Sequence, residues 1–244
     1  MKKVIVTGDY HAQYLNLKAF NKMLKFTKQY KPDVFVINGD LVDAFSISKF
    51  EKNPKRKTTL YNEVIIVINI LDKIRNCVGK KCKIYWTKGN HLDRLSRYLN
   101  THSELLDFPF FDIETLFKLK KFNVVFVNAL NDYDKNNKGL GHLILGDMLI
   151  MHGDGRLNGA KTSINSGASC LKTCKKFFTN VCMNHVHRLA LVYHHSPYKD
   201  LVCMECGCLC DINGGMEWTQ GFGTFEFSGK KSFNHRVIRV EDLK

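Results

Sequence analysis

Five short clusters of histidine, aspartate and asparagine hold the side chains of this sequence that are best suited to chemistry. They are Asp9-Tyr10-His11, Gly39-Asp40-Leu41-Val42-Asp43, Gly89-Asn90-His91, His152-Gly153-Asp154 and Asn184-His185-Val186-His187. Each cluster alone is weak evidence, because a lone histidine is more often a hydrogen-bonded structural residue than a ligand. Together they contain five of the ten histidines. Carboxylate, imidazole and amide groups suit Mn²⁺, Fe or Zn²⁺, so the set predicts a centre for divalent metals.

Three of the clusters directly follow apolar runs that are typical of β-strands. These runs are Lys2–Thr7, Asp33–Ile37 and Lys83–Thr87. A segment with helical spacing, Tyr14–Tyr30, and a long apolar segment, Leu60–Ile74, separate them. This alternation predicts a parallel sheet with crossover helices. Ligands of such sheets lie beyond the carboxyl ends of the strands, so we expect the polar clusters to share one crevice.

The second half of the chain has a different pattern. It offers a strand candidate at Asn123–Asn128, a hairpin at His142–Met151 that turns at Gly146-Asp147, a helix at Ser166–Phe178 and a strand at Val181–Met183. The hairpin leads into His152, and the last strand leads into His185 and His187. The i, i+2 spacing of His185 and His187, like that of Asp9 and His11, predicts extended segments with both side chains on one face. We find no linker or repeat, and expect residues 1–244 to form one domain.

The order of these clusters resembles the signature of the calcineurin-like metallophosphoesterase superfamily. The resemblance runs from Asp9 to His187, about three quarters of the chain. The tail, with Glu205-Cys206-Gly207-Cys208-Leu209-Cys210 and residues 217–222, is similar to small phage-type members. The resemblance implies an α/β fold in which two packed sheets are flanked by helices, a four-layer αββα sandwich.

The resemblance also implies a role for each matching residue. One divalent ion would be held by Asp9, His11, Asp40 and His187, and a second by Asp40, Asn90, His152 and His185. A shared carboxylate such as Asp40 holds two cations ~3.5–4 Å apart, where they activate a hydroxide that attacks phosphorus. Mn²⁺ is the expected metal, with Fe, Zn²⁺ or Ni²⁺ as alternatives.

Two further residues have implied roles in catalysis without binding metal. His91 would stabilise the transition state or protonate the leaving group. Asp43 would orient a ligating histidine. Two positions depart from the family pattern: Asn184 stands where glycine is usual, and Tyr10 where an aliphatic residue is. We expect Asn184 to adopt the left-handed turn that glycine would supply, and the ring of Tyr10 to lie at the mouth of the site.

The strong positive charge points to a polyanionic partner. Lys and Arg number 37 against 23 acidic residues, a net charge of +14, and a field of this sign attracts nucleic acid. The basic residues cluster at 49–57, 80–83, 118–121 and 172–176. A solvated lysine-rich surface explains such clusters equally well. We predict a phosphodiesterase acting on nucleic acid. Hydrolysis of a small phosphoester or nucleotide is the first alternative, and a non-catalytic nucleic-acid-binding module is the second.

The nine cysteines are odd in number, in a chain without an evident export signal, so we expect reduced thiols. Cys206, Cys208 and Cys210 alternate as on one face of a strand, which favours packing over a further zinc site. His194 and His195 are interpreted as surface or strand-pairing residues, and Arg94 and His102 as either phosphate contacts or surface pairs. No apolar run approaches the ~20 residues of a membrane span. We expect a cytoplasmic protein, and the phage-type resemblance extends this to the cytoplasm of an infected host.

Overall fold

The computed structural model describes residues 1–52, 58–105, 107–128, 141–154, 162–215, 217–229 and 233–244. Its first sheet has six strands in the order β11-β10-β1-β2-β3-β4. These are β1 (Lys2–Thr7), β2 (Val34–Asn38), β3 (Lys83–Thr87), β4 (Val124–Val127), β10 (Gly221–Phe227) and β11 (Phe233–Arg239). The strands β1 to β4 run parallel to their neighbours, as the sequence predicts, whereas β10 and β11 add an antiparallel edge.

The second sheet has five strands in the order β5-β6-β7-β9-β8. They are β5 (His142–Leu145), β6 (Met148–Met151), β7 (Asn180–Met183), β8 (Leu189–His194) and β9 (Leu201–Cys206). The first two form the predicted hairpin around Gly146 and Asp147. Because β6, β7 and β9 are parallel, the residues after β6 and β7 leave the sheet at the same edge.

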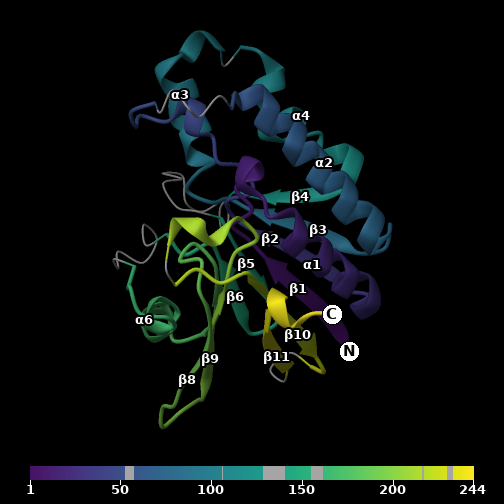
Figure 1. Ribbon diagram of the computed structural model, residues 1–244. Helices are drawn as coiled ribbons and strands as arrows, with labels where there is room; N and C mark the ends of the chain where they lie inside the picture. The colour runs from purple at the N-terminus through teal and green to yellow at the C-terminus, as the bar shows by residue number, and fades with distance from the viewer. Residues whose placement is uncertain (53–57, 106, 129–140, 155–161, 216, 230–232) are drawn as a thin grey trace.

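Helices cover the outer faces of both sheets (Figure 1). The helices are α1 (Leu17–Tyr30), α2 (Leu60–Val78), α3 (Asp93–Thr101), α4 (Ile113–Leu116), α5 (Leu119–Phe122) and α6 (Ala168–Phe177). Short 3₁₀ turns lie at Ala12–Tyr14, Phe45–Ile47, Ser103–Leu105, Pro109–Phe111, Ile212–Gly214 and Val240–Asp242. Helices α1 and α2 pack on the first sheet, and α6 packs on the second. The four-layer αββα expectation is therefore confirmed.

The alternation of side chains along β1 shows how the layers are held together. Val4 and Val6 join the core between the two sheets, whereas Ile5 joins the core beneath the helices. Every residue of β2 is buried for the same reason. Parallel strands that are covered on both faces are continuously apolar, which is why these runs stand out in the sequence.

Capping residues explain where the helices differ from their predicted bounds. Helix α1 begins at Leu17, because the Asn16 side chain accepts a hydrogen bond from the Ala19 N–H. Helix α2 extends beyond Ile74 to Val78 and ends at Gly79, whose φ of +73° lies in the left-handed region that favours glycine. Among the described residues, no helix combines the length and apolarity that crossing a bilayer requires.

Candidate metal centre

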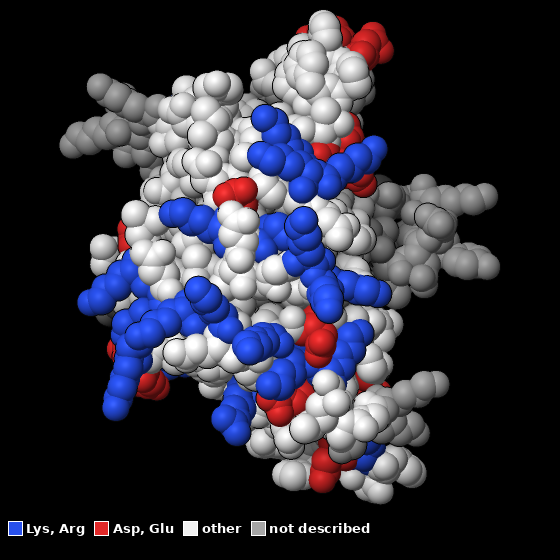
Figure 2. Space-filling model, turned by 90° about the vertical axis from the view of Figure 1, so that its right-hand side faces the viewer, with Lys and Arg blue, Asp and Glu red and all other residues white. Residues whose placement is uncertain are grey.

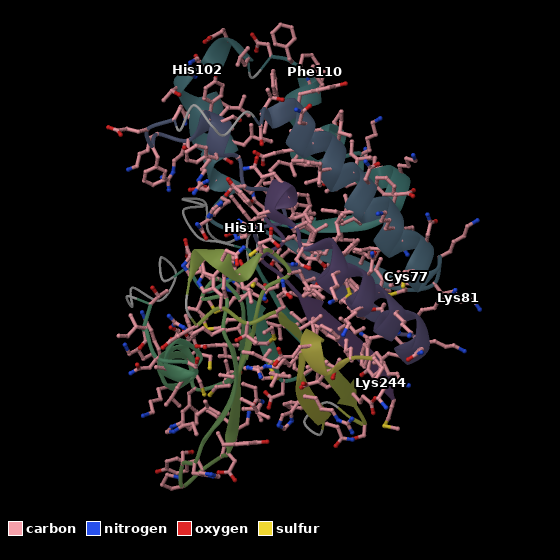
Figure 3. The ribbon with its side chains drawn as sticks, viewed as in Figure 1. His11, Cys77, Lys81, His102, Phe110 and Lys244 are labelled. Atoms are coloured by element: carbon pink, nitrogen blue, oxygen red, sulfur yellow. The ribbon has the colours of Figure 1, made fainter. Side chains whose placement is uncertain are left out.

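The five sequence clusters meet where the parallel strands of both sheets end. Asp9 follows β1, Asp40 follows β2 and Asn90 follows β3 in the first sheet. His152 follows β6, and His185 and His187 follow β7 in the second sheet. Figure 3 shows His11 in the middle of the molecule, between the regions that the two sheets occupy. The predicted crevice is thus formed by loops from both layers.

The loops that supply these residues are not extended. The φ angles are 51° at Asp9, 47° at His11, 26° at Asp40, 69° at His185 and 57° at His187. Left-handed backbone at non-glycine residues is uncommon and costs about 1–3 kcal/mol each. The predicted extended geometry of the two i, i+2 pairs is therefore wrong, although the side chains of each pair do converge. Such strain persists only where the surrounding structure enforces it, as at functional sites.

The glycines of two clusters make room for the polar residues. A Cβ on Gly39 would lie 2.2 Å from Nδ1 of His152, and φ is +80° at this glycine. A Cβ on Gly89 would lie 2.2 Å from Oδ1 of Asp40. Both contacts are far shorter than real Cβ contacts, so glycine is required at these positions for the clusters to approach one another.

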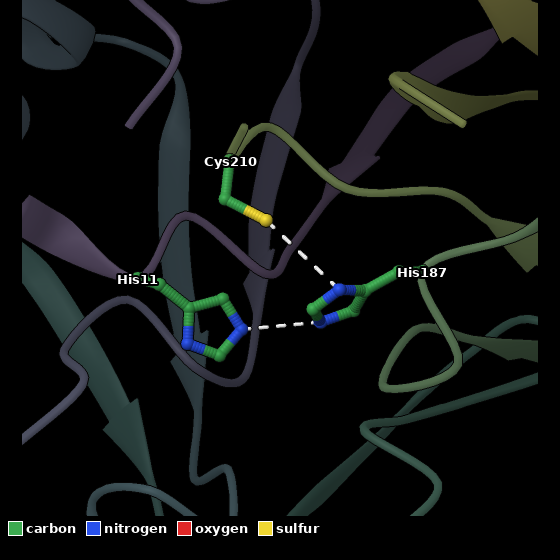
Figure 4. Close-up of side chains that lie close together, drawn as sticks. All are labelled: His11, His187 and Cys210. Carbon is green, nitrogen blue, oxygen red and sulfur yellow. Dashed lines mark hydrogen bonds between the residues drawn. The ribbon is translucent and has the colours of Figure 1, made fainter. Parts of the chain in front are cut away.

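Asp9, His11 and His187 form the first group of candidate ligands. Nε2 of His11 lies 3.1 Å from Nε2 of His187, which in turn lies 3.4 Å from Oδ1 of Asp9. Figure 4 shows the His11 and His187 rings facing each other, with Cys210 on the far side of His187. Oδ1 of Asp9 is buried and has no hydrogen-bond partner among the described residues. An unpartnered carboxylate oxygen beside two imidazole nitrogens fits a bound cation.

Asp40, Asn90, His152 and His185 form the second group. Nε2 of His152 lies 2.9 Å from both Oδ2 of Asp40 and Oδ1 of Asn90, and 3.3 Å from Nδ1 of His185. The Asn38 carbonyl lies 3.1 Å from Nδ1 of His152. A proton on Nδ1 is donated to this carbonyl, which leaves Nε2 to face the group, as ligating histidines require.

Asp40 lies between the two groups. Its carboxylate is within 4.8 Å of the imidazole nitrogens of His152 and His185 on one side, and of those of His11 and His91 on the other. Together with Asn90, the residues of both groups are the complete predicted ligand set. The structure brings them together and gives Asp40 the position that a bridging ligand would need.

The carboxylates and imidazoles of the centre shift one another's pKa values. Burial alone raises the pKa of Asp40, but His152, His91 and His11 outweigh it and hold the pKa well below its ordinary value. Burial alone lowers the pKa of His152, but the Asp40 carboxylate raises it to about 9. Asp9 raises the pKa of His187, against the effect of burial, to about 10. Metal binding requires neutral imidazoles, so it would release protons here.

His91 is held by Asp43 and lies beside Arg94. Nδ1 of His91 is 2.6 Å from Oδ1 of Asp43, and Arg94 donates to the Asp43 carbonyl at 2.7 Å. Burial lowers the pKa of His91, but Asp40 and Asp43 raise it above its ordinary value overall. Asp43 was predicted to orient a ligating histidine. Its short contact is instead with His91, because the nearer nitrogen of His11 is 3.6 Å away.

Two expectations about individual residues are wrong. Tyr10 is fully buried, and its hydroxyl lies 2.6 Å from the Thr7 hydroxyl, so its ring is in the core and not at the mouth of the site. Asn184 does not supply the left-handed turn, which falls at His185 and His187. The Asn184 side chain instead accepts a hydrogen bond from Asn38 and donates one to the Gly207 carbonyl, which ties the two sheets together.

The three tail cysteines do not share one face of a strand, because β9 ends at Cys206 and Gly207 turns the chain with a φ of +70°. Sγ of Cys206 lies 3.2 Å from Sγ of Cys182 in the core between the sheets. Sγ of Cys210 lies 3.9 Å from Nδ1 of His187, on the side away from His11. Sequence reasoning therefore missed Cys210 as a neighbour of the centre.

The centre opens into a cleft of about 690 Å³. Its walls include the aromatic side chains of Tyr14, Phe45, Phe50 and Trp218. The Trp218 ring packs edge-on against His187, with centroids 4.0 Å apart. These aromatic residues were not found from the sequence, since no local pattern separates them from core residues.

The basic clusters are spread over different faces. Lys83 begins β3, whereas Asn90 and His91 follow the opposite end of that strand, and Figure 3 shows Lys81 at the edge of the molecule, well away from His11. Figure 2 shows Lys and Arg across the side to which α1 and α2 end. Of the 49–57 cluster, residues 53–57 lie outside the described residues, while Lys49 lines a cavity next to the centre.

A family model for calcineurin-like phosphoesterases matches residues 2–214, which contain every candidate ligand. The chain belongs to the calcineurin-like phosphoesterase family. This family comprises metal-dependent phosphoesterases that bind divalent ions, and the histidine and aspartate groups described above are the corresponding residues of this chain. No curated protein sequence matches the chain.

Solved structures of metallophosphoesterases share the fold. A metallophosphoesterase from Sphaerobacter thermophilus is 14% identical, with a TM-score of 0.51 over 99% of this chain and 91% of that one. YfcE, a phosphoesterase from E. coli, is 14% identical, with a TM-score of 0.40 over 99% and 95% of the two chains. Vps29 from Chaetomium thermophilum is 12% identical, with a TM-score of 0.45 over 98% and 97%.

Proposed function

We propose that this calcineurin-like phosphoesterase hydrolyses phosphodiester bonds with two divalent ions. Asp9, His11, Asp40 and His187 would hold one ion, and Asp40, Asn90, His152 and His185 the other. The observation that carries the proposal is the buried Asp9 oxygen without a partner, which faces two imidazole nitrogens. Mn²⁺ is the metal we propose first, because oxygen and imidazole ligands suit it and no thiolate belongs to the set.

Two ions bound there would supply Lewis-acid polarisation of the phosphoryl oxygens and activation of a water molecule. The protein supplies the proton. Asp43 holds Nδ1 of His91 and orients the ring, and the raised pKa of His91 favours the protonated form. His91 can then donate a proton from Nε2 to the leaving oxygen. Arg94, whose Nη2 lies 3.3 Å from this nitrogen, is placed to bind a phosphoryl oxygen.

Nucleic acid is the substrate we propose, on the basis of charge. The net charge of +14 supports attraction of a polyanion, and Lys49, Arg94 and Arg97 line the cavity beside the centre. Phosphate contacts position a strand but do not specify its sequence, so we expect little sequence preference. Of the further residues proposed for this track, Lys52 is described by the structure, whereas Lys55, Arg56 and Lys57 lie outside the described residues.

The decisive experiment measures hydrolysis of a chromogenic phosphodiester by purified protein. Activity should vanish with a chelator and return with Mn²⁺. Asp40→Asn should reduce it beyond the ~10²–10³-fold that one transition-state donor contributes, since both ligand groups lose a charge. Full activity after rigorous chelation would contradict the two-metal proposal.

A second measurement addresses the nucleic acid. Binding of DNA or RNA should weaken steeply with salt, because each neutralised phosphate releases counterions. Reversal of Lys52, Lys55, Arg56 and Lys57 to glutamate should reduce cleavage of nucleic acid more than cleavage of the small ester. Equal loss of both activities would favour the small-phosphoester alternative. Salt-sensitive binding without any metal-dependent hydrolysis would favour the binding module.

A further inference from the structure

A second cavity, of about 510 Å³, adjoins the metal cleft. Phe50, Arg94 and His185 line both spaces, and Asn90 of the second ligand group also faces the smaller one. The volume lies within the ~300–1,000 Å³ of ordinary ligand pockets. Whatever occupies this cavity is therefore a neighbour of a phosphoryl group bound at the metal centre.

Phe50 stands at the junction of the two spaces. Its side chain is 55% exposed, so it does not serve the core. Cζ of Arg94 lies 5.7 Å from the centre of its ring, and the same guanidinium donates to the Asp43 carbonyl beside His91. An exposed aromatic ring with an arginine beside it is a stacking platform for a nucleobase, since every base has a π-face.

Cations and a second aromatic ring continue the wall away from the centre. Lys49 and Arg97 line the cavity together with Tyr98, against the carboxylate of Asp154. Arg97 remains largely exposed, although it is paired with Asp93 at 2.8 Å. Aromatic rings interleaved with cations match the alternation of base and phosphate along a single strand. A small phosphoester would leave this wall unused.

We propose that the second cavity binds the nucleotide unit attached to the scissile phosphate, with its base stacked on Phe50 and the next phosphate directed toward Lys49 and Arg97. This inference rests on the proposed phosphodiesterase function, since it assumes a phosphate at the metal centre. It makes Phe50 a specificity-determining residue that favours nucleotide diesters over small ones.

The test compares two substrates with the same leaving group. One is the p-nitrophenyl ester of thymidine 5′-phosphate, and the other is methyl p-nitrophenyl phosphate, which has no base. Phe50→Ala should lower kcat/KM for the thymidine ester roughly tenfold, mainly through KM, because the base loses its stacking partner. The methyl ester should be hydrolysed as before. Phe50→Tyr should restore the preference for the nucleotide.

Phe110→Ala is the matched control. Phe110 is 52% exposed, close to the value for Phe50, and Figure 3 shows it at the far end of the molecule from His11. Its loss should affect neither substrate. An equal fall in both activities for Phe50→Ala, or no fall in either, would overturn the inference while leaving the proposed function intact.

Direct binding separates this inference from a failure of the proposed function. If the wild-type protein hydrolyses neither ester with Mn²⁺, the proposed function has failed. Calorimetric titration with thymidine 5′-phosphate then tests the cavity on its own. Binding by the wild type that Phe50→Ala weakens roughly tenfold would support the site. Absence of binding, or equal binding by both proteins, would overturn it.

Discussion

The two sheets contribute different chemistry to one centre. Loops of the first sheet supply the carboxylates of Asp9 and Asp40, whereas loops of the second supply the imidazoles of His152, His185 and His187. The raised pKa values of His152 and His187 have their main favourable cause in the carboxylates of the opposite sheet. Neither layer has a complete site, so the centre depends on how the sheets pack together.

Each half also contains a buried glutamate that accepts hydrogen bonds from backbone N–H groups. Glu63, in α2 beneath the first sheet, accepts from Asp43 at 3.0 Å and Ala44 at 2.7 Å. Glu205, in β9 of the second sheet, accepts from Gly167 at 2.8 Å and Cys170 at 3.2 Å, at the start of α6. The same interaction thus supports the loop of His91 in one half and a helix end in the other.

The largest effect should come from the first sheet, where the proposed proton donor lies. His91→Asn should slow hydrolysis ~10²–10⁴-fold, as loss of a general acid does, while the protein keeps its metals. His152→Asn in the second sheet should instead lose metal. Elemental analysis of both purified variants checks the contrast. A His91→Asn protein that lacks an ion would make His91 a ligand.

Exchange of the two buried glutamates for glutamine tests whether the halves differ in function. Glu63→Gln should lower kcat ~10–100-fold, the range for residues that support active ligands, because it loosens the loop of Asp43 and with it His91. Glu205→Gln should leave kcat unchanged. Thermal unfolding of both variants reveals any general loss of structure. Equal losses of kcat at matched stability would erase the distinction.

Glu205 should also leave a signature in the pH dependence of stability. Burial raises its pKa above the ordinary 4.5, although hydrogen bonds from Gly167 and Cys170 oppose the shift. The folded state therefore keeps the proton longer than the unfolded state, and stability falls as pH rises from 4.5 through the folded pKa. Chemical denaturation across this window should show a shallower fall for Glu205→Gln. A steeper or unchanged slope would contradict the assignment.

The smallest effect is expected at the cysteines of the second half. Cys206→Ser combined with Cys208→Ser should leave the metal content unchanged, because neither thiol belongs to a candidate ligand group. Cys210→Ser is the matched variant, since Cys210 is the thiol next to His187. Loss of one zinc per chain in the double variant would show that these thiols bind metal.

The sequence by itself determined the ligand set and the parallel core of the first sheet. Both are local properties, because a buried parallel strand is one continuous apolar run, and each ligand follows its strand within a few residues. The hairpin before His152 could be predicted for the same reason, from the turn at Gly146 and Asp147. The fold-level resemblance then supplied the assignment of residues to two ions.

Only the tertiary structure decided what depends on contacts between distant segments. The partner of Asp43, the burial of Tyr10, the use of Asn184 as a tie between sheets and the nearness of Cys210 to His187 all result from packing across layers. The cavity beside Phe50 is of the same kind, since α3 and the loop after β2 meet there. Local patterns record which side chains a segment carries, whereas their neighbours are set by how the sheets and helices close on one another.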